Sequence, residues 1–464
     1  MKRTFLSAIT LGTACLAALT GCATKPPQTT KAWTEPRPLG KELSTYRPPR
    51  DGTNAPAHPP TVEEPTGALT LRQALALALA KNPELAAFSW DVRAGEARLL
   101  QAGLRPNPVV TFEPQDITGS GDYSGGGRSE ITLQLGQLIE LGGKRAARMR
   151  AAALERDLAG WDYETKRIAV FSQTAQDFLD VLREQQRLAL AEETIRLAQQ
   201  VVDTVTARVK AAATHAEEAT KAEVALASVQ IERDQIERAL VAARQRLAAN
   251  WSSAQPRFER AEGNLDSIAP IPALEQLSQK LAQNPELARW TTEISQREAA
   301  LQLEKTKAKP DITVGGGYRR KEESGDDVAV LGVSIPLPLF NRNQGKIKEA
   351  EYRLARSQEE QRASEVRVTT ALNQAYQALA AAQSEISALK QKVLPGAQSV
   401  FETVSEHYRE ARYSYLEVLD AQRTLFSARS QLLRSLTDYH RAVLAIERLI
   451  GEPLPAAADK PQPN

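Results

Sequence analysis

Two carboxylates near the C-terminus have a spacing that concentrates negative charge. Glu417 and Asp420 lie three residues apart in Tyr415-Leu416-Glu417-Val418-Leu419-Asp420, and an α-helix brings residues at that spacing to one face. Such a pair attracts cations when it borders a narrow opening. On spacing alone, an ordinary solvated helix face is the favoured interpretation. The pair is therefore a candidate site whose meaning depends on where its helix lies.

The other reactive residue types predict neither catalysis nor a resident metal. The chain has four histidines, none of them in a His-x-x-x-His or Glu-x-x-His pair. For His215 and His407, which lie near the helix turns, a surface role is favoured over metal ligation. The run Gly125-Gly126-Gly127 is not followed by a helix, as a phosphate-binding loop would be. No Ser/His/Asp grouping is evident. We expect a protein that is not an enzyme and that carries no metal and no cofactor.

The N-terminus predicts secretion and a lipid anchor. Basic Lys2 and Arg3 precede an apolar stretch over residues 5–19, which is the layout of a signal peptide. Its end, Leu19-Thr20-Gly21-Cys22, resembles the bacterial lipobox, in which the cysteine is acylated. We expect residues 1–21 to be removed and Cys22 to carry lipid, with an ordinary signal peptide as the alternative. Residues 22–65, rich in proline and threonine, are expected to form an extended arm.

Composition narrows the possible classes. The 464 residues include 59 Lys+Arg and 57 Asp+Glu, a formal charge of +2. That balance predicts no general attraction to nucleic acid. A quarter of the residues are charged and the mean hydropathy is −0.39. No apolar run of about 20 residues occurs beyond the N-terminus, which excludes a helical membrane protein with many spans.

The body of the chain is an internal duplication. Lys81-Asn82-Pro83-Glu84-Leu85-Ala86 recurs as Gln283-Asn284-Pro285-Glu286-Leu287-Ala288. In each copy a helix ends at proline, two β-like runs with period-two alternation follow, and a long helix pair comes next. We expect the first copy at 66–251, with strands near 108–114 and 130–137, and the second at 272–452, with strands near 311–318 and 327–335. Residues 252–271 would form a linker at mid-height, and residues 453–464 a tail.

Long amphipathic helices dominate both copies. They are expected over 143–208 and 344–407, with returning helices over 219–250 and 415–450, and Pro395 should kink the second. Spacings of three and four, or of seven, predict coiled-coil packing. The residues that carry this pattern are Ile168, Phe171, Ala175, Phe178 and Leu182 in the first copy, and Leu419, Phe426 and Leu433 in the second.

Four short strands per chain do not close a sheet. An open sheet edge is not tolerated in lipid, because its backbone N–H and C=O groups have no partners there. We therefore expect several chains to combine their strands into one closed barrel. Three chains would give twelve strands, within the range of membrane barrels. The alternative is a pair of surface hairpins on a water-soluble coiled coil.

The repeats and junction motifs carry a family resemblance. The repeated Asn-Pro-Glu-Leu unit and the run Tyr415-Leu416-Glu417-Val418-Leu419-Asp420 resemble the TolC-type outer-membrane factors. More narrowly, the junctions Ile139-Glu140-Leu141-Gly142-Gly143-Lys144-Arg145 and Pro338-Leu339-Phe340-Asn341-Arg342-Asn343 resemble their cobalt–zinc–cadmium, CzcC-like branch. The resemblance spans residues 66–452. It implies a mainly α protein with a small β-barrel: a homotrimer with twelve strands, continued into a helical tunnel in the periplasm.

The same resemblance implies function and partners. The expected role is an outer-membrane exit duct that receives heavy-metal cations from an inner-membrane RND pump through a periplasmic adaptor. No nucleic-acid partner is expected. A duct for drugs or other organic compounds is the first alternative, and a lipidated periplasmic scaffold without a pore is the second.

The resemblance also assigns site residues at the ends of the long helices. Glu417 and Asp420 match carboxylates that ring the periplasmic entrance, and Glu218 is the first-copy equivalent of Glu417. Tyr408 matches a residue that helps to hold the entrance closed. The two turns, which contain Arg208 and Ala212 in the first copy and Ala411 in the second, match adaptor-docking tips. The family carries glycine where Ala212 and Ala411 stand.

Overall fold

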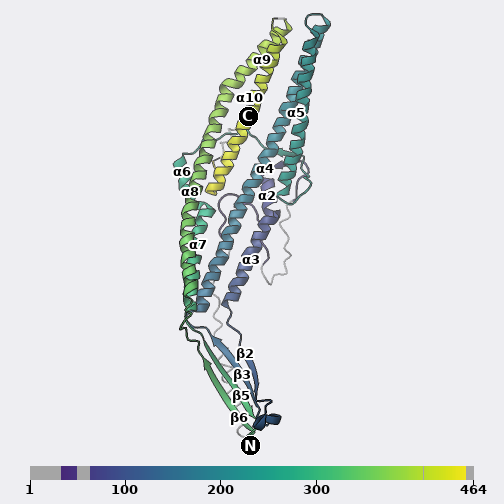
Figure 1. The fold of residues 1–464 in the computed structure, drawn as a ribbon. Coiled ribbons are helices and arrows are strands. Elements are labelled where there is room, and N and C mark those ends of the chain that lie inside the picture. Colours follow the sequence, from purple (N-terminus) through teal and green to yellow (C-terminus); the bar gives the residue numbers. More distant parts are fainter. Residues whose placement is uncertain (1–32, 50–62, 411, 456–464) are drawn as a thin grey trace.

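The protein is an elongated rod with a β-sheet at one end and two helical hairpins at the other (Figure 1). The computed structural model describes residues 33–49, 63–410 and 412–455. The expectations for the signal peptide, Cys22, Ala411 and most of the tail lie outside the described residues. Among the helices within these ranges, none is both long and apolar enough to cross a membrane.

The order of elements repeats along the chain. The first copy contains α2 (Leu71–Lys81), α3 (Pro83–Gly103), β2 (Val109–Gln115), β3 (Glu130–Ile139), α4 (Lys144–Lys210) and α5 (Ala216–Ala249). The second contains α6 (Leu274–Lys280), α7 (Pro285–Lys307), β5 (Ile312–Lys321), β6 (Asp326–Ser334), α8 (Gln344–Ala388), α9 (Leu394–Arg409) and α10 (Tyr415–Ile450). The predicted mainly α fold with two repeats of helix, two strands and a long helix pair is confirmed.

The four long strands form one antiparallel sheet in the order β2-β3-β5-β6. Leu133 of β3 lies opposite Phe112 of β2 and Tyr318 of β5. Since side chains alternate along a strand, paired residues share a face. One face is therefore largely apolar, and carries Val110, Phe112, Ile131, Leu133, Leu135, Tyr318, Leu331 and Val333. The ion pair of Arg320 with Asp327 lies on the same face, at the end remote from the helices. The other is mostly polar, and carries Thr111, Glu113, Glu130, Thr132, Gln134, Arg319 and Lys321.

Ion pairs tie the polar face together across strands. Glu130 of β3 accepts from Arg319 and Lys321 of β5, each at 3.1 Å. The Nε of Arg319 also donates to the Thr132 hydroxyl at 3.0 Å. These contacts fix the register between the strand pair of the first copy and that of the second.

The strand-to-helix junctions explain the two junction motifs. Gly142 and Gly143 have φ values of +68° and +77°, and Gly143 caps α4. A Cβ on Gly142 would be strained by this φ and would also displace the side chain of Lys309, whose Cδ lies 2.5 Å from the Cβ position, so glycine is favoured there. At the second junction Asn343 caps α8 with φ +60°. Its Nδ2 donates to the Glu304 carbonyl at 2.9 Å. Asparagine tolerates this left-handed conformation better than most residues.

The long helices extend the body far from the sheet. The 67 residues of α4 span about 100 Å at a rise of about 1.5 Å per residue. Near Pro395 the second copy forms a π-helical turn over Leu389–Val393 instead of a break, and the Leu394 N–H donates to the Leu389 carbonyl. The wider turn shifts the hydrogen-bond ladder before the proline, which lacks an N–H. Consequently α8 and α9 follow one another directly.

The main core lies at mid-body, where the linker packs into it. Trp251, Phe258 and Leu265 are buried among residues of α4, α5 and α10. Two three-residue strands, β1 (Ala68–Thr70) and β4 (Arg260–Glu262), pair in parallel. This pair was not predictable from the sequence, because three residues are too short for a periodic signal.

Residues 33–49 differ from the extended arm that their composition suggested. Leu39 is buried in a second core cluster with Tyr163 and Phe171 of α4. The Trp33 ring packs edge-on against Tyr163 with centroids 5.0 Å apart. The aromatic and apolar residues of the segment therefore attach it to the helical body. The prediction of an extended arm rested on proline content and did not take these residues into account.

The repeated Asn-Pro motif caps a helix and anchors it to another. Asn82 Oδ1 accepts from the Leu85 N–H at 2.9 Å, while its Nδ2 donates to the Asn250 carbonyl at 2.9 Å. Asn284 does the same in the second copy, accepting from Leu287 at 3.0 Å and donating to the Leu449 carbonyl at 2.7 Å. One side chain thus satisfies an orphan donor at a helix start and a carbonyl at the end of a long helix.

Replacing Asn82 with alanine is expected to destabilise the protein by about 2–4 kcal/mol, because a cap and a buried partner are lost together. Asn82→Asp keeps the acceptor for Leu85 but loses the donor to Asn250, so an intermediate loss is expected. Thermal unfolding followed by circular dichroism measures both. If both variants unfold at the same temperature as the parent, the helix cap and the hydrogen bond to Asn250 contribute nothing to stability.

Candidate functional site

The two hairpin turns lie together at the end of the body remote from the sheet (Figure 1). A cluster of buried side chains, here called the tip cluster, joins α4 and α5 to α9 and α10. It consists of Val202, Val205, Ala222, Tyr408, Tyr415 and Val418. Residues of both copies therefore meet at the tip, although they are about 200 positions apart in sequence.

Arg208, Tyr408 and Glu218 connect three helices across this tip. Arg208 of α4 donates to the Tyr408 carbonyl of α9 at 2.7 Å, and its guanidinium carbon lies 4.3 Å from the centroid of the Tyr408 ring. The Tyr408 hydroxyl donates to Glu218 of α5 at 3.4 Å. Thr214 also donates to Glu218, at 2.6 Å. The site residues Arg208, Tyr408 and Glu218 are thus brought together by the fold.

The protonation state of Tyr408 suits this arrangement. Burial raises the pKa of its hydroxyl to about 12, and the charge of Glu218 adds to the rise, whereas Arg208 opposes it. The phenol therefore keeps its proton at physiological pH and acts as a hydrogen-bond donor.

Glu417 and Asp420 lie on an exposed face of α10 and take no part in the contact of Arg208, Tyr408 and Glu218. Glu417 accepts from the backbone N–H of Ser414 at 2.7 Å and from its hydroxyl at 2.9 Å. This is a capping box, which stabilises the start of α10. Glu417 consequently has a structural role in addition to the charge that the sequence analysis emphasised.

The first tip turn is a Schellman motif built around Ala212. Ala213 donates to the Arg208 carbonyl at 2.9 Å and Ala212 to that of Val209 at 3.0 Å. Ala212 has φ +50°, a conformation that favours glycine. The second turn has the equivalent bond from Arg412 to the His407 carbonyl at 2.9 Å. Ala411 lies outside the described residues.

Replacing Ala212 with glycine is expected to stabilise the tip by about 1 kcal/mol, since glycine adopts a positive φ without strain. Ala219→Gly, inside α5, is the matched control and should destabilise by about 1 kcal/mol. Hydrogen exchange of the tip amides measures both changes. Faster exchange in Ala212→Gly would contradict the strain assigned to this turn.

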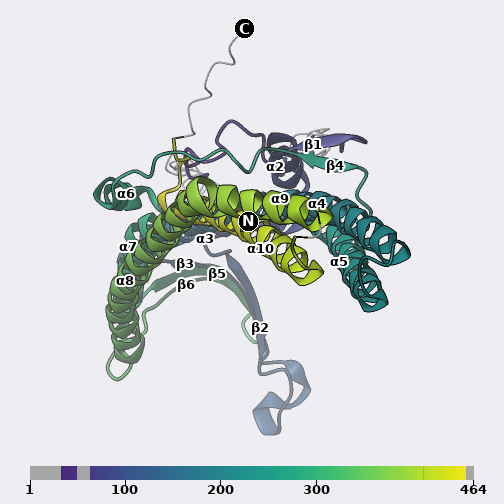
Figure 2. The same cartoon turned by 90° about the horizontal axis from the view of Figure 1, so that it is seen from above.

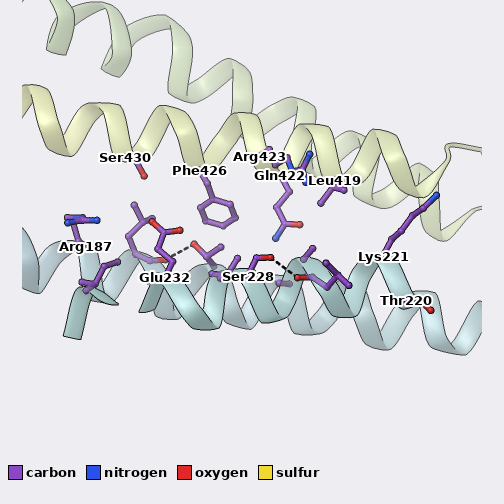
Figure 3. A pocket seen from close by; sticks show the side chains of 18 residues that line it. Arg187, Thr220, Lys221, Ser228, Glu232, Leu419, Gln422, Arg423, Phe426 and Ser430 are labelled. Carbon is purple, nitrogen blue, oxygen red and sulfur yellow. Dashed lines mark hydrogen bonds between the residues drawn. The ribbon is translucent and has the colours of Figure 1, made fainter. Parts of the chain in front are cut away.

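A groove between α5 and α10 was not foreseen from the sequence. Its volume is about 500 Å³, and α4, α5 and α10 line it. Figure 3 shows Phe426 and Gln422 of α10 pointing toward α5, which contributes Ser228 and Glu232. The heptad pattern assigned Leu419 and Phe426 to a packed seam, but both line the groove, whereas Leu433 is buried in the core. Periodicity identifies an apolar face without showing what covers it.

The groove makes the tip contacts important for how the hairpins are held. Between mid-body and the tip, α5 and α10 are separated by the groove. The tip cluster and the contacts of Arg208, Tyr408 and Glu218 then join the two hairpins at their ends. The two hairpins are therefore in contact at their tips and separated by the groove below them.

No metal centre is evident at the tip or elsewhere in the described ranges, where no group of three or more His, Cys, Asp and Glu side chains could hold an ion. His440 instead lies 2.9 Å from the Leu265 carbonyl, and burial lowers its pKa. It is a partly buried residue that packs against the linker rather than a metal ligand.

A rod of paired helices with an amphipathic sheet at one end and two helical hairpins at the other suits an elongated conduit. Residues 74–253 and 276–452 match the family described as outer membrane efflux protein. The chain belongs to this family. It is an efflux protein of the outer membrane and not an enzyme, as the sequence analysis expected.

Individual relatives agree with this membership. The chain is 36% identical over 388 residues to the cobalt-zinc-cadmium resistance protein CzcC of Cupriavidus metallidurans, covering 84% of this chain and 91% of that protein. It is 25% identical to the pyoverdine export outer membrane protein OpmQ of Pseudomonas putida, over 82% and 85% of the two chains. The resemblance to the CzcC-like branch is confirmed.

Solved structures confirm the fold. A membrane protein from Pseudomonas aeruginosa superposes with a TM-score of 0.73 at 20% identity, covering 82% of this chain and 90% of that one. CusC superposes with a TM-score of 0.69 at 20% identity, covering 88% and 99%.

Proposed function

We propose that three copies of this chain form a duct through the outer membrane, with twelve strands closed into a barrel. The amphipathic sheet supports this most strongly, because one of its faces is largely apolar and the other mostly polar, and β2 and β6 are its outer strands. Barrels place an apolar face toward lipid and a polar face toward the lumen. Figure 2 shows that the helices and the sheet curve in the same direction, as copies around a common axis would.

The test of the duct is conduction. Purified from outer membranes, the protein should migrate as a heat-modifiable trimer and conduct ions in planar bilayers. A Cys22→Ala variant that behaves as a soluble monomer would instead support a lipidated scaffold without a pore.

The cargo proposed for the duct is heavy-metal cations. Support comes from the 36% identity to a protein named for resistance to cobalt, zinc and cadmium. A strain that lacks the gene should become sensitive to at least one of these metals, and not to dyes. Sensitivity to dyes alone would favour the alternative, a duct for organic compounds, to which the more distant OpmQ similarity points.

The partners proposed are a periplasmic adaptor and an inner-membrane RND pump. The adaptor would dock at the tips that contain Arg208, Ala212 and Ala411, and alanine at the last two positions permits a close approach. Cross-linking from a photoreactive residue at position 210, in the tip, should capture the adaptor, whereas position 352 on α8 should not. Cross-links from both or neither would contradict docking at the tips.

The entrance proposed lies at the same tips, with Tyr408 and Glu218 holding the hairpins together and Glu417 and Asp420 bordering the opening. Cys22 is proposed to carry the lipid anchor, in which case labelled palmitate is incorporated into the parent and not into Cys22→Ala. The anchor is covalent lipid, and we propose no cofactor.

A further inference from the structure

The segment between β6 and α8 is the most exposed apolar stretch near the sheet. Residues 335–340, here called the junction segment, read Ile-Pro-Leu-Pro-Leu-Phe. Leu337 is 74% exposed and Phe340 is 91% exposed. Such contiguous exposure of large apolar side chains marks an interaction surface.

The junction segment continues the apolar face of β6. Leu331 and Val333 lie on that face, and the same period of two continues through Ile335, Leu337 and Leu339. All five side chains are exposed. Exposed apolar side chains therefore occur at every second position from Leu331 to Leu339, from the sheet into the connection to α8.

The backbone of the junction segment is suited to an apolar environment. Pro336 and Pro338 have no N–H, and the Leu339 N–H donates to the Leu337 carbonyl at 2.9 Å. Half of the six residues thus present no unsatisfied donor. An unsatisfied N–H costs several kcal/mol in lipid but little in water, so this composition is favourable where water is scarce.

Basic side chains follow directly. Arg342 bends back toward the segment, its Nε donating to the Pro338 carbonyl at 3.3 Å, and Lys346 follows in the first turn of α8. Apolar residues flanked by cationic ones are typical of segments that lie at a phospholipid surface, where the cations meet phosphate groups.

The equivalent junction of the first copy is shorter and less exposed, with Leu141 at 37% exposure, although the basic residues Lys144 and Arg145 follow it too. Residues 140–143 connect β3 to α4, contain no proline, and include Gly142 and Gly143. The Leu141 N–H is fixed by Asp311 at 3.0 Å. Connecting the strand to the helix therefore does not in itself require the longer apolar form.

We propose that the junction segment is a membrane anchor, inserted into the phospholipid leaflet at the helical end of the barrel, with Phe340 among the acyl chains and Arg342 at the phosphates. This rests on the proposed barrel, since it continues that barrel's lipid-facing surface. A neighbouring copy of the chain is the competing occupant.

Fluorescence quenching by lipid-borne bromine tests the anchor. Phe340→Trp and, as a second position, Leu337→Trp are reconstituted as trimers into vesicles of phosphatidylcholine and phosphatidylglycerol, with or without bromine at carbons 6 and 7 of an acyl chain. Because the chain has five tryptophans, each signal is the difference from the unsubstituted protein. Leu331→Trp, in β6, is the positive control, and Tyr352→Trp, 64% exposed on α8, is the negative control.

The anchor predicts that tryptophan at 340 and 337 is quenched to an extent comparable with tryptophan at 331, and that tryptophan at 352 is not. Quenching at 331 alone overturns the anchor and leaves the barrel standing. A blue-shifted but unquenched emission at 340 means that a second copy covers it, which also overturns the anchor. No quenching at 331 contradicts the barrel itself.

Discussion

Replacing Arg167 with methionine is expected to lower the free energy of unfolding by about 3–5 kcal/mol, because it leaves a buried carboxylate without its partner. Arg167 and Glu164 are 1% and 2% exposed. Two guanidinium nitrogens donate to the Glu164 carboxylate at 2.8 and 2.7 Å. The pair thus lies in a region of low dielectric, where removing one charge is costly.

The same pair holds residues 33–49 against α4. Arg167 donates to the Leu39 carbonyl at 2.8 Å and to that of Arg37 at 3.2 Å, while Glu164 accepts from the Arg37 N–H at 2.7 Å. Arg167→Met should therefore release the segment as well as lower stability. A lower unfolding temperature would show the loss of stability, and faster tryptic cleavage within residues 33–49 would show the release of the segment.

Two controls separate the buried charge from loss of packing. Glu164→Gln combined with Arg167→Met removes both charges and should recover part of the stability. Arg233→Met removes an arginine of α5 whose side chain is 39% exposed, and should change stability by less than about 0.5 kcal/mol. If Arg167→Met is no more harmful than Arg233→Met, the pair does not anchor the segment.

The positions of the strands and long helices could be predicted from the sequence, because they depend on hydrophobic periodicity and on helix-ending residues. Period-two alternation located the strands, spacings of three and four located the long helices, and proline and glycine marked their ends. Burial of charge was not predictable. Glu164 and Arg167 are three apart on a helix, a spacing usual for exposed pairs, and the backbone of residues 33–49 covers them only after folding.

The tip also combines features that a local sequence pattern predicts with contacts that form only on folding. The capping box of Ser414 and Glu417 can be read from the sequence, since the two residues are three apart at the start of a helix. The contact of Tyr408 with Glu218 joins positions 190 residues apart, and no local pattern encodes it. The family resemblance implied that both residues belong to the entrance. The fold shows that Tyr408 of the second repeat contacts Glu218 of the first.

The charge of Glu417 and Asp420 is expected to control ion selectivity. In a trimer with these residues around the opening, Glu417→Gln combined with Asp420→Asn removes six negative charges. The ratio of cation to anion permeability should fall about fivefold, which corresponds to about 1 kcal/mol per monovalent ion at a wet, partly screened site. Block by multivalent cations should weaken in parallel. Reversal potentials under a salt gradient in planar bilayers measure the ratio.

This double variant separates charge from structure because glutamine retains an oxygen for the capping box of Ser414. The parent and the variant should therefore unfold at similar temperatures. Glu359→Gln combined with Glu360→Gln is the matched control, because it removes two exposed carboxylates of α8 that pair with Arg362 and Arg356. Unchanged reversal potentials in the 417/420 variant would show that its carboxylates do not border the conducting path. An equal change in both variants would mean that the potential follows total charge, and a ring at the entrance would then not be needed to explain selectivity.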